Sequence, residues 1–264
     1  MRLFDSHAHY NDEKFSEDRE FILEEIRREK VEKVVVAGYN LESSIEAIKI
    51  AQTHKNIYAT VGISPNDLDT VLDLEKIENL AKEKEVVAIG EIGLDYYWNK
   101  DNKEKQQELF KRQIQLANKL KLPIVIHTRE AVSDTIDILK NQIKSEKTGI
   151  FHCCPMNVEL IKEAIKLGYY ISFSGNITFK NAKNADKCIE IVPEDRILIE
   201  TDSPYMSPEP YRGQRNDSRR VIKVAQKIAE VKKKSLEEIA ELTYINAQKI
   251  FNIKDWNSHQ YMLQ

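Results

Sequence analysis

The chain has 264 residues, of which 41% are hydrophobic and 31% charged, and its formal net charge is −3. This length and apolar content support one large core, and the small negative charge excludes a protein that coats nucleic acid through bulk charge. No apolar run approaches the ~20 residues of a membrane span, no leader is recognisable at the N-terminus, and the three cysteines lack a C-x-x-C or disulfide pattern. We therefore expect a reduced, cytoplasmic protein.

Eight short stretches rich in valine, isoleucine and leucine recur along the chain and predict β-strands. They lie near residues 2–6, 33–37, 57–62, 86–90, 122–127, 149–152, 169–173 and 196–201. Charged stretches with apolar residues at three- and four-residue spacing predict helices between most of them, over residues 18–30, 41–54, 72–84, 103–121, 131–144 and 158–167. Residues 218–251 predict two more helices, the second beginning with a capping box of Ser235 and Glu238.

This alternation of strand and helix predicts an α/β fold. Eight units in one continuous chain favour a (β/α)8 TIM barrel, a single domain over residues 1–264 with the C-terminal helices packed outside the barrel. A doubly wound open sheet is the alternative, although no glycine-rich dinucleotide fingerprint follows the first strand. No pattern sets the oligomeric state, and a monomer is our expectation.

Residue types that bind metals stand at the ends of five predicted strands. They are His7 and His9 after the first strand, Glu91 after the fourth, His127 after the fifth, His152 after the sixth and Asp202 after the eighth. Because the carboxyl ends of barrel strands meet at one mouth, these six side chains should converge there. His54 and His259 follow no strand, and we expect both to be solvated.

Four imidazoles and two carboxylates predict a site for divalent ions. Imidazole suits Zn²⁺, Mn²⁺ or Ni²⁺, whereas Mg²⁺ prefers an oxygen-rich shell. A divalent ion at such a site would activate a bound water for hydrolysis, with Glu91 and Asp202 as the candidate catalytic carboxylates and Asp202 as the general base. Glu200 and Asp5 lie deeper on the strands of Asp202 and His7, so we expect them to support the ligands.

Basic and aromatic residues near the predicted mouth are candidates for substrate binding. Arg129 and Arg212 are placed to hold a phosphate oxygen, whereas Arg219 and Arg220 are expected to be solvated surface charges. Aromatic residues that could line the mouth and stack nucleobases are Tyr96, Tyr97, Trp98, Tyr205 and Tyr211. We expect either Tyr97 or Trp98 to pack in the core instead, and Asp95 to line the mouth.

Six motifs surround these candidates: FDSHAHYN at 4–11, GEIGLDYY at 90–97, HTREA at 127–131, FHC at 151–153, ISFSGNITFKNA at 171–182, and ETDSPY with PYRGQRN at 200–205 and 210–216. Together they resemble the TatD-type metal-dependent deoxyribonucleases of the amidohydrolase-like barrels. The resemblance implies a two-metal site, with His7, His9 and Asp202 on one ion, His127 and His152 on the other, and Glu91 bridging. It also implies Mg²⁺- or Mn²⁺-dependent 3′-to-5′ trimming of single-stranded DNA, and extends to RNA.

Two segments depart from the pattern of that family. In VGISPN at 61–66, Ser64 and Asn66 stand where family members typically carry histidines, which removes a contact to substrate phosphate or to a third metal. After His152, Cys153 and Cys154 stand where the family usually continues with an aromatic residue and serine. We expect one of these cysteines to be buried and the other to line the site, which alters the fit of substrate there.

The main alternative is a metal-dependent deacylase or amide hydrolase of the same barrel superfamily, because that chemistry uses the same metal-activated water. Many amide-cleaving relatives bridge their metals with a modified lysine at the end of the fourth strand. This chain has Glu91 at that place, which favours phosphodiester hydrolysis. A non-enzymatic metal-binding protein or nucleic-acid scaffold would have no need of six ligands around an open water position.

Overall fold

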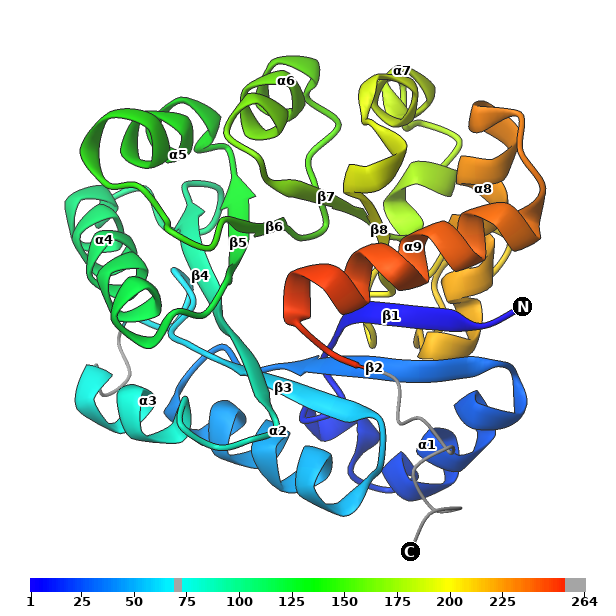
Figure 1. The fold of residues 1–264 in the computed structure, drawn as a ribbon, viewed down its shortest axis with the longest axis horizontal. Coiled ribbons are helices and arrows are strands. Elements are labelled where there is room, and N and C mark those ends of the chain that lie inside the picture. Colours follow the sequence, from blue (N-terminus) through cyan, green and yellow to red (C-terminus); the bar gives the residue numbers. More distant parts are fainter. Residues whose placement is uncertain (69–72, 255–264) are drawn as a thin grey trace, which may run out of the picture.

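The computed structural model describes residues 1–68 and 73–254, and its centre is a sheet of eight parallel strands, each paired with its neighbour in sequence (Figure 1). The strands are β1 (Leu3–Ala8), β2 (Val31–Ala37), β3 (Ile57–Val61), β4 (Val86–Asp95), β5 (Ile124–Arg129), β6 (Gly149–Phe151), β7 (Tyr170–Phe173) and β8 (Ile197–Ile199). All eight predicted strands and the barrel are confirmed. The largest difference is β4, which continues five residues beyond its predicted end.

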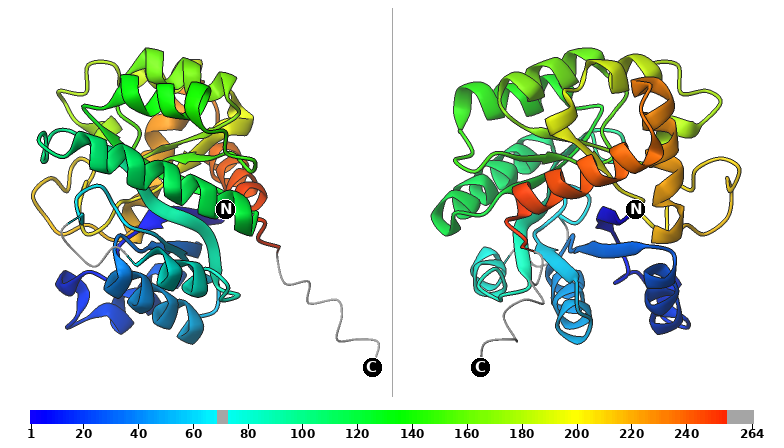
Figure 2. Two further views of the ribbon diagram at one scale, coloured as in Figure 1. Left: turned by 90° about the vertical axis from the view of Figure 1, so that its left-hand side faces the viewer. Right: turned by 45° about the vertical axis from the view of Figure 1, so that its right-hand side comes forward.

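Helices surround the strands and follow them in chain order (Figures 1 and 2). They are α1 (Arg19–Arg28), α2 (Leu41–Thr53), α3 (Leu74–Leu80), α4 (Lys103–Leu120), α5 (Val132–Asp137), α6 (Val158–Lys166), α7 (Ala185–Ile191), α8 (Val221–Lys232) and α9 (Leu236–Phe251). The sequence patterns missed the short α7. The helix predicted over 131–144 ends early as α5 and continues as a wider π-helical turn, Ile138–Gln142, and residue 72 of the helix predicted over 72–84 lies outside the described residues. Within the described ranges, no helix has both the length and the apolar character to cross a membrane.

The barrel closes where the segment after β8 meets β1. The backbone N–H of Asp202 donates a hydrogen bond to the carbonyl of His7 at 2.9 Å, and that of His9 donates to the carbonyl of Ser203 at 2.6 Å. Asp202, His7 and His9 are three of the six candidate ligands. The closure of the barrel therefore places residues almost two hundred positions apart side by side.

The interior of the barrel changes from apolar to polar along its axis. Its apolar end is filled by residues from the strands and from α9, including Phe4, Val125, Ile150, Leu198, Tyr244 and Phe251. Because strand side chains alternate, the next inward positions after Val125 and Ile150 are His127 and His152. The ring of Phe4 lies 5.8 Å from that of Tyr244. Thus α9 closes the amino-terminal end of the barrel, as Figure 1 shows, while α8 packs beside α7 on the outside.

The N-terminus of α9 has the predicted capping box. Ser235 Oγ accepts from the backbone N–H of Glu238 at 3.2 Å, and the Glu238 carboxylate accepts from the backbone N–H of Ser235 at 2.9 Å. Replacing Ser235 with alanine should lower the free energy of unfolding by about 1 kcal/mol, because one N–H of the first turn loses its partner. Urea denaturation measures this, and Ser235→Asp, which can accept the same bond, should retain most of the stability. Equal midpoints for the alanine variant and the unmodified protein would contradict the role of the cap.

Candidate metal centre

The six candidate ligands converge at the carboxyl end of the barrel. Glu91 lies within β4, His7 within β1 and His127 within β5, while His9, His152 and Asp202 lie in the segments just after β1, β6 and β8. Five of the six are buried and His127 is partly buried. The structure therefore brings together all six residues that were predicted from their positions at strand ends.

The first group of ligand atoms contains His7, His9 and Asp202. The Nε2 atoms of His7 and His9 are 3.2 Å apart. Asp202 Oδ1 lies 3.3 Å from His9 Nε2 and 3.7 Å from His7 Nε2. One carboxylate oxygen of Glu91, Oε2, faces the same pair, at 3.5 Å from His7 Nε2 and 3.7 Å from His9 Nε2.

The second group contains His127 and His152, and it shares Glu91 with the first. The other carboxylate oxygen, Oε1, lies 3.2 Å from His127 Nδ1 and 3.6 Å from His152 Nε2. These two ring nitrogens are 3.3 Å from each other. Glu91 thus presents one oxygen to each group. Within the described part of the chain, three sets have ligand atoms all within 4.8 Å of one another: His7, His9 and Glu91; Glu91, His127 and His152; and His7, His152 and Asp202, which joins the two groups.

The arrangement of ring nitrogens fits divalent ions. Two imidazole nitrogens that face each other at 3.2 or 3.3 Å can share only one proton, whereas their lone pairs can point at a common cation. Nitrogen and carboxylate ligands without thiolate suit Zn²⁺, Mn²⁺ or Ni²⁺. The residues present therefore fit the ions that the sequence predicts.

Outer partners orient two of the rings by their remaining nitrogens. His9 Nδ1 lies 3.2 Å from the carbonyl of Ala37, and His127 Nε2 lies 2.9 Å from Asp95 Oδ2. Bonds of this kind fix which nitrogen carries the proton and which faces a metal. The His7 Nδ1 atom, by contrast, is buried without a hydrogen-bond partner among the described residues.

Asp95 is a positioning residue whose role the sequence patterns missed. It was expected to line the mouth, but it is buried and its Oδ2 also accepts a bond from Asn66 Nδ2 at 3.2 Å. Asn66 is one of the residues that depart from the family pattern, and here it supports the partner of His127. The available signal was the spacing, since Asp95 stands four residues after Glu91, and in the extended β4 it pairs with Arg129, two residues after His127.

Glu200 and Asp5 both lie below the ligands, as expected. Glu200 Oε1 accepts from the backbone N–H of Cys153 and lies 3.5 Å from His152 Nδ1, too far for a well-formed hydrogen bond. Asp5 accepts from the backbone N–H and hydroxyl of Thr201 and from the Ser218 hydroxyl. Burial raises the pKa of Asp5 to about 7. Through these hydrogen bonds Asp5 connects β1 to the segments after β8.

Burial and neighbouring polar or charged groups shift the pKa values of the candidate ligands in opposite directions. Burial by itself would raise the pKa of Glu91, but the neighbouring His152, His127 and His7 hold it well below its usual range. Burial would lower the pKa of His127, but its bonds to Asp95 and Glu91 raise the value to about 9. A ligating imidazole must give up the proton on its ligand nitrogen, so protons compete with cations for this site. Metal affinity should therefore decrease as the pH is lowered.

Replacing Asp95 with asparagine should weaken metal binding by about 10- to 100-fold. The amide nitrogen that replaces Oδ2 in asparagine cannot accept a hydrogen bond from His127 Nε2, so the ring loses the bond that orients it. Competition with a chelating dye measures the affinity, and Asp101→Asn, an exposed residue of the following loop, is the matched control. Unchanged affinity in Asp95→Asn would show that the orientation of His127 does not depend on this carboxylate.

Two aromatic residues beside the site are exposed. Tyr97 is 45% and Trp98 65% exposed, and their rings form an edge-to-face pair with centroids 4.8 Å apart. The expectation that one of them packs in the core is wrong, because the chain turns outward after Asp95. The guanidinium of Arg129 lies 3.8 Å from the centroid of the Tyr97 ring. These three side chains form one contiguous surface.

Tyr96 and Tyr205 occupy different environments. Tyr96 is only 6% exposed, and its hydroxyl donates to Asp134 and accepts from Gln107. These two hydrogen bonds therefore hold Tyr96 within the protein. Tyr205 is 44% exposed, donates from its hydroxyl to Asp12, and lies with its ring centroid 6.3 Å from that of His9.

The arginine-rich segment after Asp202 is largely engaged within the protein. Arg212 stacks on Phe179, with its guanidinium 3.6 Å from the ring centroid. The neighbouring arginines bond to other residues: Arg215 to Asp18, Arg219 to Asp217, and Arg220 to Gln214. Arg219 and Arg220 were expected to be solvated surface charges, and both remain partly exposed while also bonding within the protein.

The remaining cysteines and histidines lie outside the two groups. Cys154 is buried and Cys153 partly buried, as expected, and burial raises the pKa of both thiols well above the usual value. His54 ends α2 and lies 2.9 Å from Glu20, so it is paired rather than simply solvated. His259 lies outside the described residues.

Comparison with known proteins agrees with the motifs. The family model described as TatD related DNase matches residues 4–252. The chain is 44% identical over 253 residues to the uncharacterized metal-dependent hydrolase YabD of Bacillus subtilis, covering 95% of this chain and 99% of that protein. It is 35% identical over 256 residues to YcfH of Escherichia coli K12, which carries the same description, covering 96% and 97%.

Solved structures show the same architecture. YjjV, a TatD homolog from Escherichia coli K12, superposes with a TM-score of 0.91 at 28% identity, covering 96% of this chain and 99% of that one. An organophosphorus hydrolase from Deinococcus radiodurans shares the fold alone, with a TM-score of 0.68 at 11% identity over 94% and 92% of the two chains. Because the family model matches residues 4–252 and a relative is 44% identical over 95% of the chain, the chain belongs to the TatD-related DNase family.

Proposed function

We propose that this protein is a divalent-metal-dependent phosphodiester hydrolase, a deoxyribonuclease that trims single-stranded DNA, and also RNA, from the 3′ end. The observation that carries the proposal is the placement of Glu91, whose two oxygens face two separate groups of imidazole nitrogens. A carboxylate shared in this way suits two ions and phosphoryl chemistry. The family model, described as a DNase, and relatives named as metal-dependent hydrolases support the same reading.

Each residue of the site has a defined role in the proposed reaction. His7, His9 and Asp202 would hold one ion and His127 and His152 the other, with Glu91 bridging. The ions would supply the activation of water and the stabilisation of charge on phosphorus. Asp202 would also accept the proton of the attacking water, while Arg129 and Arg212 would bind non-bridging phosphate oxygens.

The exposed aromatic surface supports a nucleic acid as substrate. Bases stack on aromatic rings regardless of sequence, and Tyr97, Trp98 and Arg129 present such a surface next to β5, the strand of His127. Tyr205 offers a second ring beside His9. Buried ligands at the mouth of a barrel are more accessible to a single-stranded end than to a phosphate within a duplex.

Replacing Trp98 with alanine should raise KM for single-stranded DNA roughly tenfold and leave kcat within about twofold, because one stacked base is worth about 1–3 kcal/mol of binding. Initial rates over a range of oligonucleotide concentrations separate the two constants. Ile245→Ala removes a similarly exposed apolar side chain from α9, at the amino-terminal end of the barrel, and should change neither constant. A loss confined to kcat would instead place Trp98 in the chemical step.

The decisive experiment is nucleotide release from single-stranded DNA labelled at either end, with Mg²⁺, Mn²⁺ or a chelator. Metal-dependent loss of mononucleotides from the 3′ end, absent in the chelator and in Glu91→Gln, supports the proposal. Release from the 5′ label would reverse the polarity but keep the chemistry. Absence of trimming, together with metal-dependent cleavage of acyl esters or amides, would favour the deacylase or amide-hydrolase alternative.

A further inference from the structure

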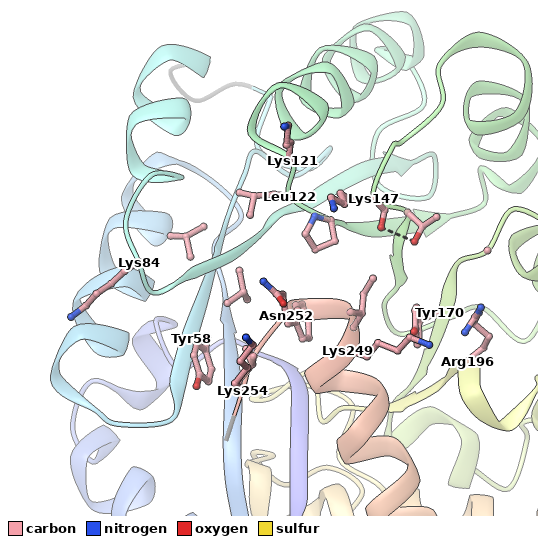
Figure 3. Close-up of a pocket in the computed structure, with 18 residues that line it drawn as sticks. Tyr58, Lys84, Lys121, Leu122, Lys147, Tyr170, Arg196, Lys249, Asn252 and Lys254 are labelled. Atoms are coloured by element: carbon pink, nitrogen blue, oxygen red, sulfur yellow. Dashed lines mark hydrogen bonds between the residues drawn. The ribbon is translucent and has the colours of Figure 1, made fainter. Parts of the chain in front are cut away.

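A cavity lies at the amino-terminal end of the barrel, opposite the candidate metal centre and beside the end of α9 (Figure 3). It has a volume of about 830 Å³. Six basic side chains line it, and no acidic side chain of the described residues does: Lys84, Lys121, Lys147, Arg196, Lys249 and Lys254. Over the whole chain acidic residues outnumber basic ones, 43 to 40, so this lining is a local segregation of charge.

The cations come from separate parts of the chain. Lys84, Lys121, Lys147 and Arg196 each stand shortly before one strand, β4, β5, β6 and β8 in turn, and Lys249 and Lys254 lie at the end of α9 and just beyond it. In a parallel barrel these pre-strand positions share one face. Figure 3 shows the side chains arranged around the same opening.

Most of this positive charge is not neutralised nearby. Lys84 lies 3.4 Å from Glu85, and Arg196 lies 2.8 Å from Asp195. The four other lysines, Lys121, Lys147, Lys249 and Lys254, have no acidic partner within 4 Å in residues 1–68 and 73–254.

Helix termini explain only part of the cluster. Lys121 caps α4 and Lys249 lies in the last turn of α9, where a cation interacts favourably with the helix dipole. Neither Lys147 nor Lys254 lies within a helix. Like charges gathered without partners repel each other, and an anion would relieve that repulsion.

The cavity is separate from the metal centre. Its apolar lining includes Val87, Tyr170 and Phe251, which belong to the cluster that fills the amino-terminal end of the barrel. This packed layer lies between the cavity and the ligands at the opposite mouth. A molecule bound here therefore does not contact Glu91 or the histidines.

We propose that this cavity binds a compact anion carrying two or more phosphate groups. The volume lies within the range of small-molecule sites, which suits a nucleoside triphosphate or a short inorganic polyphosphate. Lysine ammonium groups on flexible stems bind phosphate as point charges, so several can converge on adjacent phosphates. Tyr170, whose ring lies 5.0 Å from the Arg196 guanidinium, gives the site an aromatic wall.

The test is isothermal titration calorimetry of the full chain with inorganic tripolyphosphate and, separately, with ATP, both in EDTA. The double variant Lys147→Gln/Lys249→Gln removes two unpaired cations from the cavity. The matched control, Lys105→Gln/Lys187→Gln, removes two exposed lysines elsewhere. We expect saturable binding that weakens at least tenfold in the cavity variant, remains unchanged in the control, and declines as salt is added.

Binding of both probes would assign recognition to the phosphates, and binding of ATP alone would add the base to what the cavity recognises. No saturable binding of either probe, or equal binding by both double variants, would overturn the proposal. Lysine-dependent binding confined to long single-stranded DNA would replace it with a nucleic-acid surface. Circular dichroism checks the fold, and Lys121→Gln/Lys254→Gln is the second variant if the first does not fold. Glu91→Gln should bind tripolyphosphate as the unmodified protein does, which separates this result from the proposed function.

Discussion

Glu91→Gln should lower kcat for DNA trimming at least a thousandfold, equivalent to about 4 kcal/mol of transition-state stabilisation. The substitution keeps the volume of the side chain but removes its charge and replaces one oxygen with an amide nitrogen, which cannot ligate. Since Oε2 faces His7 and His9 while Oε1 faces His127, either orientation of the amide removes a ligand from one group. Single-turnover rates with Mn²⁺ and metal analysis of the purified variant measure the two consequences.

Glu130→Gln is the matched control for this variant. Glu130 follows β5, is exposed, and lies 3.9 Å from Lys100 without contacting the ligand groups. Its rate should equal that of the unmodified protein. If Glu91→Gln retained its metal and its full rate, the shared-carboxylate arrangement would have no part in catalysis, and the two-metal proposal would fail.

His7→Ala and His127→Ala should each remove one bound ion per chain and lower the rate at least a hundredfold. The two histidines belong to different groups, so the variants empty different positions. Two-metal hydrolysis needs both ions to stabilise the attacking and leaving oxygens. Inductively coupled plasma mass spectrometry counts the ions, and the trimming assay gives the rates.

The barrel should remain folded in both variants, because its core consists of apolar residues at the other end and between strands and helices. His54→Ala, which removes an imidazole paired with Glu20 away from the mouth, controls for the loss of a histidine. Full activity with two ions in both ligand variants would show that the hydrolytic centre lies elsewhere. Loss of an ion from only one variant would indicate a single-metal enzyme.

The sequence patterns predicted the convergence of the candidate ligands because of a geometric property of parallel barrels. Strand side chains alternate and all carboxyl ends meet at one mouth, so chemistry-bearing residues at strand ends must converge wherever they stand in the chain. His7 and Asp202 are almost two hundred residues apart and nevertheless face one another at 3.7 Å. Knowledge of strand boundaries was therefore enough to place them.

The surroundings of the ligands depended on contacts that periodicity does not encode. Asp95 was expected to line the mouth, but pairing with β5 extends β4 and brings its carboxylate to His127. The same extension turns Tyr97 and Trp98 outward, against the expectation that one is buried. Where a strand ends because of its pairing with a neighbouring strand, the residues of that strand alone do not predict its end.

Thus the sequence by itself determined the fold class, the eight strands and the six side chains at the mouth, since these follow from local periodicity and barrel topology. Only the tertiary structure decided that Glu91 offers one oxygen to each histidine pair, because this depends on side-chain direction across β1, β4, β5 and β6. It also decided that α9 closes the barrel and that unpaired lysines gather beside it. Those features arise where segments distant in sequence pack together, and packing fixes positions that local propensity leaves open.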